Sequence, residues 1–344
     1  MTSTPTSRMR RVVVSPDRID VVEADVPSPG EGEALVQTVL AGVCGTDTHA
    51  AAGHHPFVSL PYRPGHEVVG VVRAVGAGVD GVQPGDRVTV EPTLPCWDCK
   101  MCRTDRSNLC ENLRFFGCGW EQGGMADYFT LPANRLHPVP DEVSDLDATL
   151  IEPLSTPVHA VGLAGDLTGS AVAIIGCGTI GLLMLAAVRR AGARAVVMTD
   201  PLAAKRELAL RSGADAVVDA AAPDAVGQVR AALGESADAV FDCVASRSTV
   251  PQAVAMALKA GTVVVVGVPS GGIELPLALI QDQQVRVQGS ATYLPEDIAV
   301  ATAMVAAGEV RAADLVTAQF PFAEVAAAFA ASASGAHVKV VLTA

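Results

Sequence analysis

Residues 171–190 read AVAIIGCGTIGLLMLAAVRR. The first five residues are apolar and predict a buried strand, whereas the stretch after residue 181 predicts a helix. At the turn between them stand Gly176, Gly178 and Gly181, in the spacing G-x-G-x-x-G that is typical of a dinucleotide site. Gly176 permits the tight turn, Gly178 lets a pyrophosphate approach the backbone, and Gly181 lets the helix pack on the strand. We predict that these glycines bind the dinucleotide together with Thr179 and Ile180, because the helix N-terminus carries partial positive charge.

Asp200 stands at the end of the next predicted strand, 24 residues after Gly176. An acid about 20 residues beyond the first glycine is expected to accept hydrogen bonds from the adenosine ribose. Its charge would repel a 2′-phosphate, so Asp200 favours NAD over NADP. Asp200 could instead be an ordinary helix N-cap, and the two roles are compatible. Lys205 and Arg206 are nearby cations that would favour a 2′-phosphate, and Lys205 is also predicted to bind the cofactor.

The chain changes character along its length. Residues from about Met9 to Thr130 are rich in valine and broken by glycine, which predicts β structure. After Pro157, strand-like runs alternate with alanine-rich helical stretches, which predicts a parallel sheet covered on both faces. The segment after Tyr293 predicts two helices and a last strand at His337–Leu342, and can return to the first domain. The strands predicted after Pro157 are Ala171–Ile175, Ala195–Thr199, Ala216–Val218, Ala239–Asp242, Thr262–Gly267 and Val285–Gln288.

Four cysteines, Cys96, Cys99, Cys102 and Cys110, lie within fifteen residues in the spacing C-x2-C-x2-C-x7-C. Four thiolates from one compact loop satisfy a tetrahedral zinc ion, so the spacing predicts a structural zinc site. The alternatives are a pair of disulfides and chance clustering of the cysteines. The first eleven residues are polar and then basic, with no apolar run behind them, so they do not resemble a secretory leader. We therefore predict reduced cysteines and a cytoplasmic protein.

Composition limits the partners of the chain. Its 344 residues suffice for two domains, and half of them are apolar. The net charge of −13 argues against nucleic acid as a partner. The stretch Ala171–Val188 has 18 residues without a charge, which is long enough to suggest a membrane span. Its three glycines within six residues favour a strand, a turn and a helix instead, so no membrane partner is expected.

Three further motifs complete the pattern: Cys44-Gly-Thr-Asp, Pro64-Gly-His-Glu and Ile151-Glu-Pro. With the cysteine cluster and the glycine fingerprint, they make the chain resemble the zinc-dependent medium-chain alcohol and polyol dehydrogenases, in the branch of sorbitol and threonine dehydrogenases. The resemblance implies an α/β fold, with a GroES-like β-rich catalytic domain and a Rossmann domain whose parallel sheet is doubly wound. It places the catalytic domain at residues 1–154 and 290–344, with the zinc lobe at about 91–112, and the Rossmann domain at 155–289.

The resemblance also implies a second, catalytic zinc ion. Cys44 and His66 are its expected ligands, and Glu67 and Glu152 are the remaining carboxylates, with direct or water-mediated binding left open for each. Cys44 by itself could equally be a buried apolar residue. Asp47 is expected to brace the ring of His66.

A proton relay is implied beside this metal. Thr46 would take the proton of the substrate hydroxyl, and His49 would pass it to solvent, although His49 could be only a surface residue. Glu67 belongs to this catalytic group as well. Val266 is expected to flank the nicotinamide, and Val268 is also expected to bind the cofactor. Hydride transfer then requires the two domains to share one cleft.

The expected reaction is hydride transfer between NAD and a secondary alcohol of polyol, sugar-acid or cyclitol type. Sorbitol dehydrogenases carry an Arg-Tyr pair where this chain has Thr292-Tyr293, which argues against sorbitol itself. Two alternatives are a zinc-free quinone or enoyl reductase of the same fold and a protein that binds zinc and NAD without turnover. An exposed sheet edge at Val285–Gln288 predicts a homodimer or a homotetramer.

Overall fold

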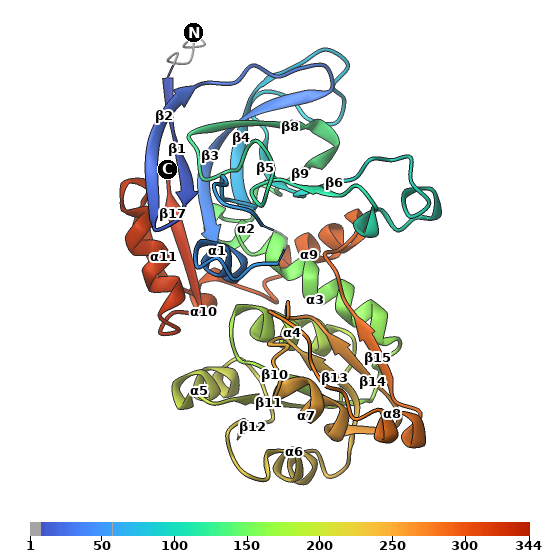
Figure 1. Ribbon diagram of the computed structural model, residues 1–344. Coiled ribbons are helices and arrows are strands. Elements are labelled where there is room, and N and C mark those ends of the chain that lie inside the picture. Colours follow the sequence, from blue (N-terminus) through green and yellow to red (C-terminus); the bar gives the residue numbers. More distant parts are fainter. Residues whose placement is uncertain (1–7, 57) are drawn as a thin grey trace. The chain divides into compact units, whose positions relative to one another are not determined.

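The computed structural model describes residues 8–56 and 58–344, and the chain forms two compact units (Figure 1). One unit runs up to Glu152 and resumes with Leu294–Ala344, and the other is Pro153–Tyr293. These boundaries fall two residues before and four residues after the predicted ones at 154 and 289. Phe57 and the first seven residues of the stretch inspected for a leader lie outside the described residues.

The unit Pro153–Tyr293 is built on a six-stranded sheet in which every neighbouring pair is parallel. The strand order β12-β11-β10-β13-β14-β15 is that of a doubly wound dinucleotide-binding sheet, so the predicted Rossmann fold is confirmed. The strands are β10 (Ala171–Ile175), β11 (Ala195–Asp200), β12 (Ala216–Asp219), β13 (Ala237–Asp242), β14 (Ala257–Val265) and β15 (Arg286–Gly289).

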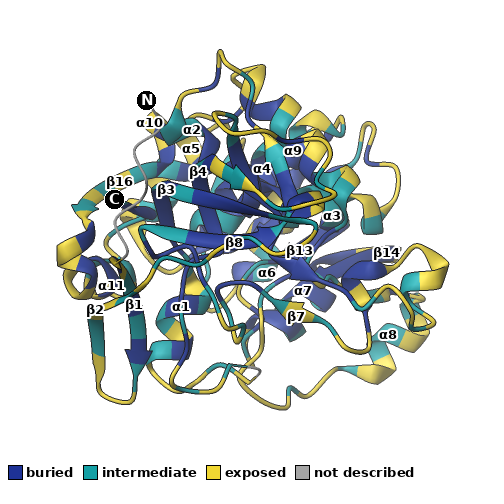
Figure 2. Cartoon of the chain, turned by 90° about the horizontal axis from the view of Figure 1, so that it is seen from above, coloured by how far each residue is buried: buried dark blue, intermediate teal, exposed yellow. Residues whose placement is uncertain are grey.

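Helices follow the strands of this sheet, as parallel crossovers require. They are α4 (Thr179–Arg190), α5 (Ala203–Arg211), α6 (Ala225–Leu233), α7 (Thr249–Met256) and α8 (Leu277–Gln283), while α3 (Ile151–Ala164) enters the unit. The strand order reverses between β10 and β13, and a crevice at the carboxyl ends of the strands at such a point is where ligands bind. All five residues of β10 are buried, as expected of a strand covered on both faces. The neighbouring strand β13 is likewise mostly buried (Figure 2).

The other unit contains a seven-stranded sheet of order β16-β17-β3-β4-β5-β9, with β8 also paired to β3. Its strands are β3 (Glu33–Val43), β4 (Glu67–Val75), β5 (Arg87–Val90), β8 (Tyr128–Pro132), β9 (Leu136–Pro138), β16 (Val316–Pro321) and β17 (Lys339–Thr343). The hairpins β1 (Arg8–Ser15) with β2 (Arg18–Asp25) and β6 (Thr93–Leu94) with β7 (Arg114–Phe115) lie outside this sheet. The predicted last strand is therefore confirmed, and it lies in the interior of the sheet rather than at its edge.

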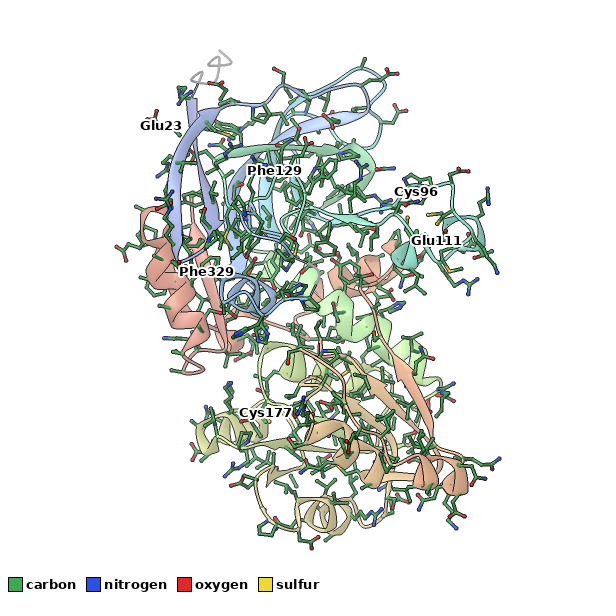
Figure 3. All side chains as sticks on the ribbon, in the orientation of Figure 1. Glu23, Cys96, Glu111, Phe129, Cys177 and Phe329 are labelled. Carbon is green, nitrogen blue, oxygen red and sulfur yellow. The ribbon has the colours of Figure 1, made fainter. Side chains whose placement is uncertain are left out.

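The remaining helices of this unit are α1 (Gly45–Ala51), α2 (Asp145–Ala148), α9 (Pro295–Ala306), α10 (Ala312–Leu315) and α11 (Val325–Ala333). Phe116 and Phe129 stack with ring centroids 4.9 Å apart in a core that also holds Phe329 of α11; Phe129 and Phe329 are labelled in Figure 3. The chain after Leu294 thus supplies both a sheet strand and core side chains. Across the described residues, no helix is long and apolar enough to cross a membrane.

Candidate active site and metal centres

Cys44 lies where β3 ends and α1 begins, and it is the N-cap residue of that helix. The carboxylate of Asp47 accepts a hydrogen bond from the backbone N–H of Cys44 at 3.1 Å, which closes the first turn of the helix. Asp47 is fully buried. Two residues of the predicted relay share the short helix: Thr46 is half-buried, whereas His49 is exposed to solvent.

His66 is positioned by backbone packing on both sides of the segment that carries it. Gly65 has φ +105°, and a Cβ at this position would overlap the backbone of Gly124 and Met125. The backbone N–H of Gly124 donates to the carbonyl of Gly65 at 2.7 Å. The imidazole of His66 is buried and packs edge-on against the ring of Phe115, with centroids 5.6 Å apart. Backbone contact of this closeness requires glycine at these turns.

The side chains of Cys44, His66 and Glu67 converge, with one ligand atom of each within 4.8 Å of the others. Thiol, imidazole and carboxylate are donors that zinc accepts, and three protein ligands leave a position for substrate. The Nδ1 atom of His66 is buried and has no hydrogen-bond partner in the described chain. Three convergent donors and an unsatisfied buried ring nitrogen fit a metal ion at this site.

Lys339 is a member of this site that the sequence did not indicate. Its ammonium forms an ion pair with Glu67 and donates to the carbonyl of Val43 at 3.3 Å. Both charged side chains are 2% exposed. Burial lowers the pKa of Lys339, but Glu67 and Cys44 outweigh that effect and raise it. The pairing arises because β17 lies antiparallel to β3, and no local pattern in the sequence encodes that contact.

The predicted role of Asp47 needs a different account. Asp47 does not hydrogen-bond the ring of His66: besides Cys44, its carboxylate accepts from the hydroxyl of Tyr62 at 3.2 Å. Asp47 acts on His66 through its charge instead. Burial lowers the pKa of His66, but Cys44, Asp47 and Glu152 outweigh that effect and raise it well above its usual value.

Glu152 is buried at the first turn of α3 and acts electrostatically on both His66 and Lys339. It lies outside the convergent group of Cys44, His66 and Glu67. His55 and Cys118 also interact electrostatically with residues of the site, although neither was predicted as a site residue. Burial and the charges of His49 and His66 lower the pKa of His55, and burial raises the pKa of Cys118 to about 12.

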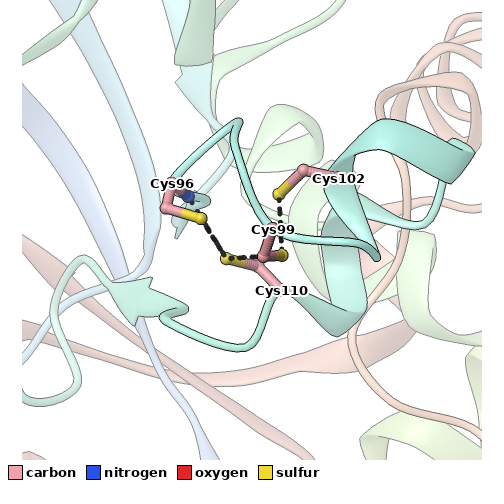
Figure 4. A group of neighbouring side chains, drawn as sticks. All are labelled: Cys96, Cys99, Cys102 and Cys110. Atoms are coloured by element: carbon pink, nitrogen blue, oxygen red, sulfur yellow. Dashed lines mark hydrogen bonds between the residues drawn. The ribbon is translucent and has the colours of Figure 1, made fainter.

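The four-cysteine cluster forms a compact lobe (Figure 4). Neighbouring sulfur atoms are 3.4 Å apart between Cys96 and Cys110, 3.5 Å between Cys99 and Cys102, and 3.9 Å between Cys99 and Cys110. Zinc with four bonds of about 2.3 Å to sulfur needs sulfurs roughly 3.8 Å apart. Hydrogen bonds from the backbone of Asp98 and Cys99 lower the pKa of Cys96 to about 6, whereas burial and the neighbouring thiol of Cys99 raise the pKa of Cys102 to about 12.

No disulfide joins these cysteines, and all eight cysteines of the chain are free thiols. The disulfide alternative therefore does not describe this structure, and the donor set fits a closed zinc site. Backbone N–H groups also donate to the sulfurs, as from Cys96 to Cys110 at 3.2 Å and from Asn112 to Cys110 at 3.3 Å.

The glycine fingerprint joins β10 to α4, with Gly178 as the N-cap of the helix. Gly176 has φ +98° at the turn. A Cβ at Gly181 would lie 2.8 Å from the carbonyl carbon of Gly176, so this position admits only glycine. A Cβ at Gly178 would meet nothing within 4 Å, which leaves that backbone accessible to a ligand. Thr179 and Ile180 open the helix, so this geometry fits a pyrophosphate at its N-terminus.

Asp200 ends β11 beside this turn. Its carboxylate accepts from the backbone N–H of Cys177 at 2.9 Å and of Leu202 at 2.9 Å, so it joins the fingerprint loop to the start of α5. Arg206 forms an ion pair with Asp219 at 3.5 Å and also donates to the carbonyl of Asp200. Lys205 is half-buried on α5 and acts electrostatically on Cys177 of the loop.

Val266 and Val268 follow β14. The backbone N–H of Val266 donates to the carbonyl of Asp242 at 2.9 Å, and its side chain is buried. Val268 is 49% exposed. Both residues lie at the carboxyl end of the parallel strands, where a dinucleotide would be bound.

Comparison with known proteins identifies the family. Residues 30–141 match the alcohol dehydrogenase GroES-like domain, and residues 179–307 match the zinc-binding dehydrogenase domain. L-galactonate-5-dehydrogenase of Escherichia coli K12 is 32% identical over 88% of this chain and 89% of its own. The chain belongs to the zinc-dependent medium-chain alcohol and polyol dehydrogenases. Sorbitol dehydrogenase of Ovis aries is 31% identical over 96% of this chain and 95% of its own.

A solved structure from Sinorhizobium meliloti 1021, bound to NADP, has 34% identity and a TM-score of 0.92, covering 98% of this chain and 100% of that one. Both predicted domain types of the dehydrogenase, and its membership of the sorbitol and threonine dehydrogenase branch, are confirmed. The protein is an oxidoreductase whose cofactors are zinc and a nicotinamide dinucleotide. The roles of individual site residues stay predictions.

Proposed function

We propose that this dehydrogenase oxidises a secondary alcohol of polyol, sugar-acid or cyclitol type, with NAD as the hydride acceptor. The convergence of Cys44, His66 and Glu67 within 4.8 Å is the observation that carries the proposal. The relatives named for L-galactonate and sorbitol support this substrate class. When bound, zinc would lower the pKa of the substrate hydroxyl, and NAD would accept the hydride.

The protein's own residues would move the proton. Thr46 would accept it from the substrate hydroxyl and pass its own hydroxyl proton on toward solvent, since it lies on the short helix that Cys44 caps. His49 is exposed one turn further along and would exchange the proton with solvent. Glu67 would hold the metal through its carboxylate, and its ion pair with Lys339 would compete with that ligation. The metal content of Glu67→Gln and Glu152→Gln tests which carboxylate binds the metal directly. The variant that loses the catalytic zinc identifies the direct ligand.

Asp200 supports the choice of NAD. Its carboxylate is fixed by two backbone N–H groups beside the fingerprint loop, where its charge would repel a 2′-phosphate. Arg206 is engaged by Asp219 and would have to break that pair to bind such a phosphate. The Sinorhizobium meliloti protein is bound to NADP, so a direct comparison of the two cofactors is the informative measurement. Val266 and Val268 are proposed to contact the nicotinamide.

A homodimer or homotetramer is part of the proposal. β15 is an edge strand that pairs only with β14 among the described strands. An unpaired edge invites a second strand, and two copies of β15 would satisfy each other across a two-fold axis. We also propose a cytoplasmic location, which the eight free thiols support. Light scattering that gives the mass of one chain would reject the oligomer.

The test is NADH formation, followed by absorbance, with polyols, sugar acids and cyclitols in the presence and absence of a zinc chelator. Chelator-sensitive turnover of a secondary alcohol is expected. Turnover that persists after all zinc is removed would favour a zinc-free reductase, and bound zinc and NAD without turnover would favour a binding protein. His49→Asn should lower kcat and alter its pH profile, whereas His54→Asn, in an exposed loop nearby, should leave both unchanged.

A further inference from the structure

Two arginines line a small pocket in the β-rich unit. Arg11 lies on β1, and Arg63 lies in the segment that leads to β4. The pocket has a volume of about 80 Å³, and Gln122 and Tyr128 contribute to its wall. None of its lining residues is a predicted zinc ligand or part of the glycine fingerprint.

Neither arginine forms an ion pair with any residue in the described parts of the chain. The Nε atoms of Arg11 and Arg63 are buried and lack a hydrogen-bond partner in the described structure. Among the described residues, these guanidinium groups form one hydrogen bond, which Nη1 of Arg63 donates to the carbonyl of Glu121 at 2.6 Å. A buried donor without a partner is unfavourable, so both arginines, which line this pocket, retain unmet demand for an acceptor.

The neighbouring arginines of the same strand are different. Arg8 pairs with Asp25 at 3.0 Å, and Arg10 pairs with Asp127 at 2.8 Å. Asp25 also lines the pocket, but its carboxylate is engaged by Arg8 outside it. Among the residues that the structure describes, Arg8 and Arg10 of β1 therefore each have a carboxylate partner, whereas Arg11 has none.

The two unpaired arginines also repel each other. Burial lowers the pKa of Arg11, and the positive charge of Arg63 lowers it further. Two like charges are thus held close together in a protein whose net charge is −13, where acidic partners are abundant. Their proximity would become favourable once an anion neutralised both.

We propose that the pocket lined by Arg11 and Arg63 binds a phosphate group, either as free phosphate or as a small phosphomonoester. Guanidinium groups match phosphate oxygens with paired N–H donors. Two positive charges balance the charge of about −1.5 to −2 of a phosphate monoester at neutral pH. The volume exceeds the roughly 30 Å³ that one water occupies, and it accommodates one such group rather than a larger ligand.

Phosphate binding at this pocket is independent of the proposed reaction, and it is tested by measuring binding rather than enzymatic turnover. Inorganic phosphate is titrated calorimetrically into the zinc-loaded enzyme with NADH at saturation, so that the fingerprint loop is already occupied. Saturable binding with a Kd of millimolar or below is expected. Arg11→Met and Arg63→Lys should each weaken it at least tenfold, the second because a lysine keeps the charge and loses the paired donors.

Arg73→Met is the matched control. Arg73 also forms no ion pair with the described residues, but it lines a different, wider pocket on the same unit. Its loss should leave phosphate binding unchanged. Equal weakening by Arg73→Met, or unaltered binding in both Arg11→Met and Arg63→Lys, would overturn the proposal, as would the absence of saturable binding to the wild type.

A variant could bind phosphate weakly only because it folds poorly. Thermal unfolding with and without phosphate separates this effect from the loss of the binding site. Phosphate should raise the Tm of the wild type and leave that of Arg11→Met unchanged. Without phosphate, Arg11→Met should unfold at or above the wild-type Tm, because the repulsion is gone. Glycerol 3-phosphate that binds as tightly as phosphate identifies a phosphomonoester site, and weaker binding identifies free phosphate. Acetate that binds as tightly as phosphate would overturn the assignment.

Discussion

Replacing Lys339 with methionine tests the buried ion pair beside the predicted catalytic metal. Glu67 and Lys339 are both 2% exposed, so the variant leaves a carboxylate in the interior without its counter-ion. Removing one partner of a buried pair costs about 3–5 kcal/mol. In a unit of about 200 residues, 1 kcal/mol lowers Tm by about 2–4 °C. We therefore expect Lys339→Met to lower the Tm by about 6–20 °C in enzyme that lacks its catalytic zinc, where no metal ion replaces the lost counter-charge.

The assay is thermal unfolding followed by near-ultraviolet circular dichroism, with zinc content measured on the same samples. Lys259→Met is the matched control. Lys259 is exposed, so this variant should have the same Tm as the wild type. Adding Glu67→Gln to Lys339→Met should recover part of the loss, since the double variant no longer buries a lone charge. A Tm for Lys339→Met equal to that of Lys259→Met would refute the reasoning.

Three further outcomes are expected. Cys99→Ser should lower the zinc content from about two ions per chain to about one and reduce thermal stability, whereas Cys44→Ser should abolish activity in a folded protein that still binds NAD; an unchanged zinc content in Cys99→Ser would contradict the lobe. Wild-type kcat/KM should be higher with NAD than with NADP, and Asp200→Ala should narrow the difference; equal use of both by the wild type would contradict the assignment. Burial raises the pKa of Cys118 and Cys177 to about 12, so at pH 8 iodoacetamide should alkylate each about 10³-fold more slowly than an ordinary thiol, with the rate rising tenfold per pH unit; mass spectrometry that finds either modified rapidly would exclude this protection.

Local pattern was enough to predict the parallel sheet and the fingerprint. β10 has the predicted bounds, because five apolar residues before a glycine turn admit few alternatives. The tail was harder to predict. β16 at Val316–Pro321 was missed, since Val-Thr-Ala-Gln-Phe-Pro alternates between half-buried and exposed positions and carries no run of buried residues. Its pairing with β17 is long-range information that the segment itself does not contain.

The site shows the same division. Cys44, His66 and Glu67 were named from short motifs, and the structure brings their ligand atoms together. Lys339 could not be predicted, because its partner Glu67 is 272 residues away and a lone lysine in an apolar strand has no diagnostic spacing. Asp47 was expected to brace the ring of His66, but its hydrogen-bond partners are Cys44 and Tyr62. Its carboxylate satisfies the N-cap of its own helix, a local demand that competes with any distant ring nitrogen.

The interior position of β17 determines the order in which the two units can be completed. Pro153–Tyr293 is continuous in the chain, so it can fold as soon as it has been synthesised. The β-rich unit must wait, because β17 lies between β16 and β3 and is made after the entire other unit. Until then β3 lacks one hydrogen-bonding neighbour and Glu67 lacks its cation. The nascent enzyme therefore passes through a stage in which its nucleotide-binding half is folded and its catalytic half still has an open strand edge.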